Sequence, residues 1–253
     1  MRITIITQNE PFFLSENISY LLDNLPKEFQ VISCVLTKAS PFGKKKGFIS
    51  KVIESCKVFG FSFFIHYSFK FTYSKIFIPS VKRILIEKHI KLIELDGNIN
   101  SANNVQIIKN DNPDLILSIL GNQIFKNQIF DLAPKGCLNL HSALLPKYRG
   151  LMPSFWVLKN NEKKTGVSVF FVDKGIDSGP ILVQKEIQIG NMTQAELIRE
   201  TKLLGMKAII EAIHLIQENR IKLIPNHDKD ATYFSFPKRE DVREFKRAGK
   251  RFF

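Results

Sequence analysis

The sequence predicts an α/β protein with an open, mostly parallel β-sheet flanked by helices. Residues 3–7 are β-branched throughout, which is typical of a strand buried on both faces of a sheet. In the segment that follows, Ile18, Leu21, Leu22 and Leu25 recur at helical spacing. The length of 253 residues fits one large domain, or one domain with an appendage.

The same two patterns alternate along the rest of the chain. The expected strands cover residues 3–7, 31–36, 90–95, 114–120, 136–140, 166–172 and 180–189. The expected helices cover residues 15–25, 101–110, part of 121–132, 153–159 and 193–218. Ser15 is the predicted N-cap of the first helix, because its hydroxyl accepts a hydrogen bond from an otherwise unpaired backbone N–H.

Residues 45–80 interrupt this alternation with a predicted helical insertion rich in aromatic side chains. Nine aromatic residues lie between Phe59 and Phe77, with Lys70 and Lys75 among them. Aromatic rings interleaved with lysines serve single-stranded nucleic acid, and an aromatic helix with basic residues also suits a membrane surface. A helix packed into the core, or against a second copy in a homodimer, is the third interpretation.

The composition is that of a globular protein with excess positive charge. Hydrophobic residues make up 44% and charged residues 24%, which excludes a fibre or a wholly disordered chain. The net charge is +13 and the isoelectric point is about 9.6. Nucleic acid, a membrane surface and an anionic small substrate are the three partners that this charge favours, beside a plain scatter of lysines over the surface.

The cysteines and the N-terminus indicate the cellular compartment. Cys34, Cys56 and Cys137 are too few and too scattered for a disulfide framework or a Cys-rich zinc site, so a reducing, cytoplasmic setting is predicted. The first residues carry no signal-peptide pattern. The longest strongly aromatic stretch without a formal charge covers residues 58–69, which is shorter than the roughly 20 residues of a membrane span.

Three polar residues stand where an open α/β sheet collects its ligands, outside the carboxyl ends of the strands. Asn139 and His141 end one strand and face the same side, and Asp177 lies between Gly175 and Gly179. An amide that stabilises an oxyanion, an imidazole that moves a proton and a carboxylate that orients it suit acyl transfer. Without a nucleophile elbow, direct transfer to an amine fits best. Structural roles for the histidine and the aspartate are the alternative.

Three segments around these residues carry a resemblance to a known family. They are GCLNLHSALLPKYRG at 136–150, TGVSV at 165–169 and GIDSGPI at 175–181. Together they closely resemble the folate-dependent formyltransferases, which include methionyl-tRNA formyltransferase, phosphoribosylglycinamide formyltransferase and the sugar N-formyltransferases. The family pattern is Asn-x-His-x-x-Leu-Leu-Pro with a later Asp, and here Asp177 lies 38 residues after Asn139. The similarity is strongest over residues 114–189.

The resemblance implies a Rossmann-like fold, 10-formyltetrahydrofolate as formyl donor, a primary amine as acceptor and no metal. Asn139 would bond the formyl oxygen, His141 would stabilise the tetrahedral intermediate and move a proton, and Asp177 would orient His141. The residues that match the family's folate contacts are Asn122, Gln123, Ile124, Phe125, Asp173, Lys174, Gly175 and Ile176.

Departures from the relatives narrow the acceptor. Residues 7–13 lack the glycine-rich loop that holds phosphate in the glycinamide ribonucleotide enzyme. After Ile189 too few residues remain for the C-terminal barrel of the tRNA enzyme, and no regulatory domain of the deformylase kind precedes the first strand. The organisation is therefore nearest to the sugar N-formyltransferases of polysaccharide biosynthesis, with a nucleotide-linked amino sugar as acceptor.

Gln8, Asn9 and Arg149 are the predicted acceptor contacts, Arg149 through a phosphate. The alternatives are a methionyl-tRNA acceptor, hydrolysis of the formyl donor, and a non-catalytic RNA-associated module of the same fold. Nucleic acid is the weaker prediction, and peripheral membrane contact and a homodimer stay open.

The predicted organisation is a catalytic domain over residues 1–190, containing the helical insertion at about 45–80, followed by a C-terminal helix and basic tail over 191–253. Residues 236–253 hold seven basic and three acidic side chains with Val242, Phe245, Phe252 and Phe253 between them. This helical, basic extension has three possible binding partners, which are the protein's own surface, a membrane and RNA.

Overall fold

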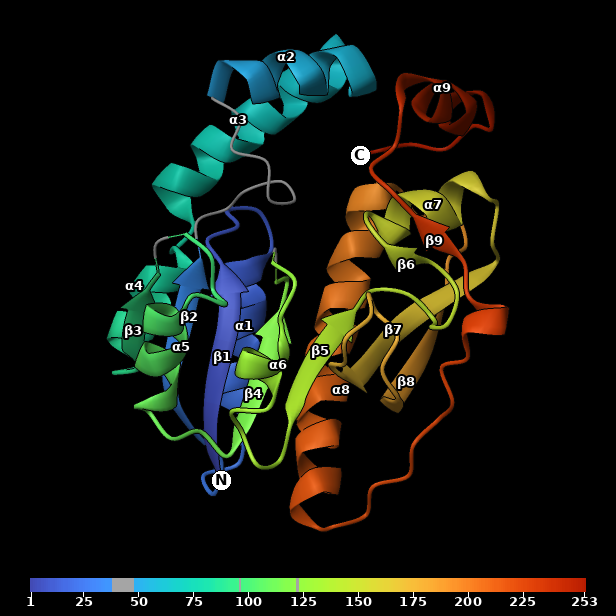
Figure 1. Cartoon of the computed structure of the whole chain (residues 1–253). Coiled ribbons are helices and arrows are strands. Elements are labelled where there is room, and N and C mark those ends of the chain that lie inside the picture. Colours follow the sequence, from blue (N-terminus) through green and yellow to red (C-terminus); the bar gives the residue numbers. More distant parts are fainter. Residues whose placement is uncertain (38–47, 96, 122) are drawn as a thin grey trace.

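The computed structural model describes residues 1–37, 48–95, 97–121 and 123–253, and the backbone alone for 48–52. Within these residues a seven-stranded sheet has the order β3-β2-β1-β4-β5-β7-β8 (Figure 1). The strands from β3 to β5 pair in parallel, whereas β7 and β8 are antiparallel to their neighbours, so the predicted α/β class and mostly parallel sheet are confirmed. The strands are β1 (Arg2–Gln8), β2 (Gln30–Thr37), β3 (Lys91–Glu94), β4 (Leu115–Ile119), β5 (Cys137–His141), β7 (Lys164–Phe171) and β8 (Ile181–Gln188).

Helices cover both faces of the sheet, and a small second sheet joins distant parts of the chain. The helices are α1 (Leu14–Asn24), α2 (Phe48–Phe59), α3 (Phe61–Phe77), α4 (Val81–Glu87), α5 (Ala102–Lys109), α6 (Asn127–Phe130), α7 (Pro153–Lys159), α8 (Gln194–Gln217) and α9 (Arg239–Arg247), with a 3₁₀ turn at Asp228–Asp230. In the second sheet β6 (Arg149–Gly150) pairs in parallel with β9 (Tyr233–Phe234). No helix in the described ranges is long and apolar enough to cross a membrane.

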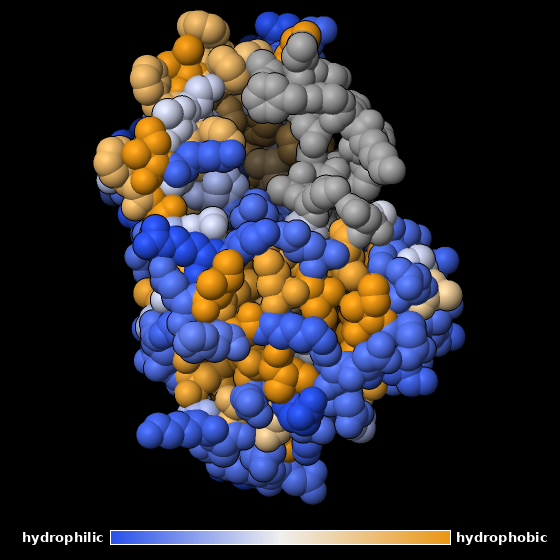
Figure 2. Space-filling view, turned by 90° about the vertical axis from the view of Figure 1, so that its left-hand side faces the viewer, coloured by the Kyte–Doolittle hydropathy of each residue, from blue (hydrophilic) through white to orange (hydrophobic). Residues whose placement is uncertain are grey.

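In the predicted insertion at about 45–80, α2 and α3 form a pair of helices that stands above the carboxyl edge of the sheet, and residues 45–47 lie outside the described residues (Figure 1). One long helix is not formed, because Gly60 adopts φ +94°, a conformation that suits glycine, and separates α2 from α3. Hydrophobic residues gather on this projecting end in the space-filling view (Figure 2).

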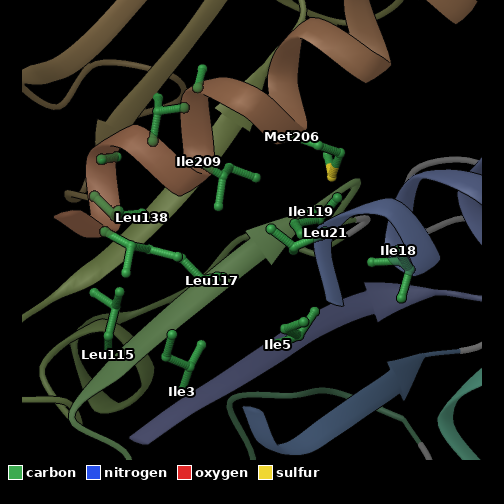
Figure 3. Packing of buried hydrophobic residues seen from close by; sticks show 14 of the residues in the cluster. Ile3, Ile5, Ile18, Leu21, Leu115, Leu117, Ile119, Leu138, Met206 and Ile209 are labelled. Carbon is green, nitrogen blue, oxygen red and sulfur yellow. The ribbon is translucent and has the colours of Figure 1, made fainter. Parts of the chain in front are cut away.

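The core lies in two layers, one on each face of the sheet. Side chains that alternate along the strands send Ile5 to the face covered by α1 and α8, and Ile6 to the face covered by α5 and α6. On the first face Met206 and Ile209 of α8 pack over the central strands (Figure 3). Because α8 is part of this core, it is an integral layer of the fold, while the predicted boundary at residue 190 stays a prediction.

The N-cap prediction for Ser15 is wrong. The helix α1 begins one residue earlier, at Leu14, and Ser15 is buried inside it. The carboxylate of Glu10 instead accepts the backbone N–H groups of Phe12, Phe13 and Leu14 at 2.9–3.0 Å. An acidic side chain at a helix N-terminus satisfies unpaired donors and the helix dipole together, so it takes over the role expected of the serine.

The basic tail docks on the protein's own surface. Phe245 and Phe252 are buried and stack on Phe155 of α7 at centroid distances of 4.9 and 6.3 Å. Backbone N–H groups of Gln194 and Ala195 donate to the carbonyls of Arg251 and Phe252. Of the three binding partners left open by the sequence, the structure shows this one.

Candidate active site

The strand β5 places Asn139 and His141 on one side of the sheet. Leu138 and Leu140 face α8, so the alternation of side chains turns Asn139 and His141 to the opposite face. Asn139 is half-buried, and no residue in the described ranges hydrogen-bonds its side-chain amide. The amide is therefore available to a bound molecule at the end of the strand.

His141 and Asp177 meet as the sequence predicted. His141 is 6% exposed, and its Nδ1 lies 3.5 Å from Oδ2 of Asp177. Its Nε2 lies 2.7 Å from the carbonyl oxygen of Tyr148. Each ring nitrogen thus faces an oxygen acceptor, which fixes the imidazole plane and lets a proton reside on either nitrogen.

The loop that carries Asp177 is held in a tight conformation. Asp177 has φ +50°, and its Oδ2 accepts the N–H of Gly150 at 2.8 Å. A Cβ at Gly179 would lie 1.7 Å from the carbonyl oxygen of Phe171, so only glycine fits there. Asp173 closes the loop from within, since its Oδ1 accepts the Gly175 N–H and the Ser178 hydroxyl.

Residues far along the chain brace this loop, and sequence reasoning missed them. The side-chain amide of Asn226 donates to the carbonyls of Asp177 and Gly179 at 2.9 and 2.8 Å. Thr232 accepts the Tyr148 N–H on its hydroxyl and the Arg149 N–H on its carbonyl. No local signal marks Asn226 or Thr232, because both act over more than 40 residues of sequence separation.

Arg149 was predicted to contact an acceptor phosphate, but the structure engages it internally. Its Nη1 pairs with Asp228 at 2.7 Å, and its Nη2 donates to the carbonyl and side-chain oxygens of Asn226. Only Nε lacks a partner among the described atoms, and it is buried. The guanidinium therefore holds the 226–228 segment beside the site, and the contact to an acceptor phosphate stays a prediction.

The predicted folate-contact residues form two segments. In the first, Gln123 bonds the backbone of Ile99 and Gly97, Phe125 is buried on the α5–α6 face, and Ile124 is 66% exposed. Asn122 lies outside the described residues. The first segment is thus anchored at its ends and presents an apolar side chain between them.

Of the second segment, Asp173–Ile176, only Asp173 and Lys174 line an open pocket of about 450 Å³, together with Gly136, Cys137 and Phe171 at the amino end of β5. Ile176 does not line this pocket and exposes 44% of its surface. Exposed apolar side chains beside backbone amides are what a flat heterocycle needs. The residues present therefore fit a pterin, while each individual contact stays a prediction.

On the other side, β1 ends at Gln8 and Asn9 follows it, and sequence reasoning missed a buried lysine near Glu10. Lys202 of α8 is 8% exposed, and burial lowers its pKa to about 8 against an opposing pull from Glu10. No acidic side chain in the described part of the chain forms an ion pair with it. A buried lysine on a core-facing helix position gives no sign in the sequence, because lysine at helical spacing is typical of a solvated face.

Within the described residues, no three His, Cys, Asp or Glu side chains gather in a way that would hold a metal ion. An amide, an imidazole and a carboxylate at the carboxyl edge of an open, mostly parallel sheet are the arrangement expected of an acyl-transfer enzyme of Rossmann-like fold, and their roles stay a prediction.

Comparison with known proteins narrows this class. The formyl transferase family model matches residues 83–213, just over half of the chain, and the chain belongs to the formyl transferase family. The chain is 36% identical over 167 residues to a methionyl-tRNA formyltransferase of Kosmotoga olearia, a match that covers 65% of this chain and 53% of that protein. The chain thus spans about half the length of the curated relatives that it matches.

Solved structures with the same fold lie in other branches of the family. An N-formyltransferase from Helicobacter canadensis, in complex with folinic acid and dTDP-3-aminofucose, has a TM-score of 0.60 at 20% identity, covering 97% of this chain and 79% of that one. The phosphoribosylglycinamide formyltransferase of Anaplasma phagocytophilum has a TM-score of 0.63 at 13% identity, covering 94% and 99%. At such identities the likeness shows the fold alone.

Proposed function

We propose that the protein transfers a formyl group from 10-formyltetrahydrofolate to a primary amine. The observation that carries the proposal is the meeting of Asn139, His141 and Asp177 at the carboxyl end of β5, in a chain of the formyl transferase family. The free thiols of the three cysteines support a cytoplasmic setting for this reaction.

The three residues divide the work of a direct transfer. The unpaired amide of Asn139 donates a hydrogen bond to the formyl oxygen as negative charge develops there, which lowers the barrier most when the donor is already in place. His141, two residues further along β5, moves a proton between the attacking amine and the leaving nitrogen. Both of its ring nitrogens face protein oxygens in the structure, so this role requires one of them to turn from Asp177 or from the Tyr148 carbonyl to the substrate. Asp177 orients the imidazole from 3.5 Å, and its own position is fixed by Gly150 and Asn226.

The donor pocket in this proposal lies between the two predicted folate segments. Ile124 and Ile176 offer apolar surface to the pterin, and the backbone of Asp173–Ile176 offers hydrogen-bonding groups to its edge. Phe125 and the Gln123 side chain keep the first segment in place from below.

For the acceptor we propose a nucleotide-linked amino sugar used in polysaccharide biosynthesis. The net charge of +13 favours an anionic acceptor. The complex of the Helicobacter canadensis structure supports this choice by analogy of fold. Gln8 and Asn9 stand at the end of β1 and are the proposed contacts to the sugar.

A methionyl-tRNA acceptor is the second candidate, because the sequence relatives carry that name. The two candidates separate in a formyl-transfer screen over amino-sugar nucleotides, glycinamide ribonucleotide and methionyl-tRNA, with a reaction lacking any amine as the test for hydrolysis. Turnover of methionyl-tRNA alone would contradict the sugar-nucleotide proposal while leaving formyl transfer intact.

The site itself is tested by Asn139→Ala, His141→Ala and Asp177→Ala. Each should lower turnover by at least ~10²-fold, the usual cost of losing an oxyanion donor or a proton-transfer group. His89→Asn, an exposed histidine at the end of α4, is the matched control and should keep full activity. Turnover near that of the unmodified protein in any site variant, with folding confirmed by circular dichroism, would contradict the role assigned to that residue.

A further inference from the structure

The helix α3 leaves an uncovered row of large apolar side chains along one side. The row, called the α3 stripe here, consists of Phe61, Ile65, Phe69, Tyr73, Ile76 and Phe77. Its members are between 36% and 75% exposed, Phe61 and Phe69 the most. Steps of three and four residues place them on one side of the helix, over a length of roughly 25 Å.

The opposite side of α3 already makes the contacts that hold the helix on the protein. Phe63 stacks on Phe59 at 4.5 Å and meets Phe252 edge-on at 5.0 Å, and Tyr67 meets Phe12 at 5.4 Å. The helix is therefore apolar on both sides, a pattern found where a helix is buried all round or meets lipid. The packed side accounts for its folding, and the α3 stripe remains without a partner in the described chain.

The surroundings of the α3 stripe are positively charged. No Asp or Glu occurs from Ser55 to Ile86. Lys57 and Lys75 are exposed, and neither has an acidic partner among the residues that the structure describes. Lys82 and Arg83 of α4, in contrast, are paired with Glu94 and Glu87.

The tail adds charge to the same end of the molecule, where α9 stands beside α2 and α3 (Figure 1). Arg239, Arg243 and Arg247 are exposed on α9. Of the acidic residues of α9, Asp241 and Glu244 pair with Lys159 of α7 at 3.4 and 2.8 Å, and Glu240 is exposed, which leaves the three arginines against one acid. The balance at this end is therefore cationic around an apolar row, which in Figure 2 forms the hydrophobic part of the projecting lobe.

We propose that the α3 stripe binds the surface of an anionic lipid bilayer, with α3 lying along the interface and no segment crossing it. Aromatic and aliphatic side chains enter the boundary between headgroups and acyl chains, and Lys57 and Lys75 meet the anionic headgroups. Each basic side chain near such a surface adds attraction that falls off within about 10 Å at ordinary ionic strength.

A second copy of the chain and RNA fit this surface less well. A two-fold contact through the α3 stripe would bring the uncompensated Lys57 and Lys75 of both copies together, with no acid between Ser55 and Ile86 to offset them. Stacking of RNA bases needs cations beside the exposed rings. Of the two lysines that interleave with the rings in sequence, Lys70 turns inward and lies 3.9 Å from the ring centre of Phe13. Lys75 lies 5.1 Å from the ring centre of Phe71, which is not part of the α3 stripe.

The test is co-sedimentation of the full-length protein with vesicles of phosphatidylcholine alone, and with vesicles that also contain phosphatidylglycerol. Binding to the anionic vesicles is expected, and added salt should weaken it. Replacing Phe69 and Phe77 together by serine should lower the partition at least ~10-fold, because two large side chains no longer leave water. The matched control, Ile86→Ser with Leu223→Ser, removes two exposed apolar side chains elsewhere and should bind as before.

Three results would overturn the proposal. The first is equal partition of the stripe variant and the unmodified protein. The second is that the unmodified protein is a dimer in analytical ultracentrifugation and does not bind vesicles, while the variant with Phe69 and Phe77 replaced is a monomer. The third is RNA binding in a gel-shift assay that depends on Phe69 and Phe77, again without vesicle binding. Formyl transfer measured without vesicles should be the same in both variants, which separates this test from that of the proposed function.

Discussion

Two aromatic regions of the protein look alike in sequence and differ in what covers them. Around α7 the rings of Phe155, Phe245 and Phe252 stack on one another, and all three are buried. Along α3 the rings of Phe61 and Phe69 point outward with about three quarters of their surface exposed. The C-terminal tail covers the first cluster, whereas no described residue covers the exposed rings of the second.

This difference shows that the number of aromatic residues in a region does not indicate how much that region contributes to the free energy of folding. A buried ring removes apolar surface from water and contributes to stability, at roughly 25 cal/mol for each Å² buried. An exposed ring contributes little to the free energy of folding, so its presence points to contact with another molecule.

The largest expected effect comes from opening the covered cluster. Phe245 is fully buried between Phe155 and Phe252, so Phe245→Ala should lower the free energy of unfolding by about 3–5 kcal/mol. Phe69→Ala, in the exposed row, should change it by less than about 0.5 kcal/mol. Urea unfolding measures both, and similar losses in the two variants would contradict the contrast drawn above.

The second largest effect is expected at Lys202 of α8, which is buried near Glu10. Its folded pKa of about 8 lies below the ordinary 10.5, so burial of the charge costs stability below pH 8. Lys202→Met should therefore raise the free energy of unfolding at pH 7 by about 3 kcal/mol. Between pH 8 and 10.5 the folded protein loses this proton before the unfolded chain does, so the advantage of the variant should shrink across that window.

Lys207→Met, an exposed lysine on the same helix, is the control and should change stability little at any pH. If Lys202 faces the acceptor, the same Lys202→Met variant should raise the acceptor KM by about tenfold, the worth of one hydrogen bond to a charged group. An unchanged KM with increased stability would assign Lys202 a place away from the acceptor.

The smallest expected effect concerns the strand that joins the covered region to the site. Gly150 has φ +94°, and a Cβ there would lie 2.3 Å from the carbonyl oxygen of Phe234. Gly150→Ala should cost about 1–3 kcal/mol of stability. Turnover should fall as well, because the Gly150 N–H is a partner of Asp177. Thermal unfolding and kcat measured together check this prediction. A loss of stability with unchanged kcat would show that the Gly150 N–H is not needed to position Asp177.

Much of the fold was predictable from local patterns. The β-branched runs gave strands within one or two residues of β1, β2, β4 and β8, because burial on both faces leaves a continuous apolar signal. The contact of His141 with Asp177 was implied by the resemblance, which relates two residues that lie 36 positions apart (177 − 141) in the sequence. The division of the insertion at Gly60 and the separate helix α4 were not foreseen, because an isolated glycine within an apolar helical pattern is compatible with a continuous helix.

The remainder depends on contacts between distant parts of the chain. Both Glu10 and Ser15 are suited by type and position to accept the free N–H groups at the start of α1. The sequence does not distinguish them, and in the structure Glu10 accepts these groups. The type and position of Arg149 suggested a phosphate contact. In the structure its guanidinium instead hydrogen-bonds Asp228 and Asn226, which lie 79 and 77 residues further along the chain. Burial of Phe245 and exposure of Phe69 are likewise set by partners that no local pattern names.

The brace formed by Asn226 and Thr232 has a consequence for synthesis of the protein on the ribosome. Every proposed catalytic side chain and the whole seven-stranded sheet have been made once α8 is complete at Gln217. Asn226, which holds the Asp177 carbonyl, and Thr232, which accepts the Tyr148 N–H, are made only afterwards. A nascent chain halted after α8 should therefore fold its core and remain a poor enzyme, so that catalysis begins only when the last segment has emerged and closed over the site.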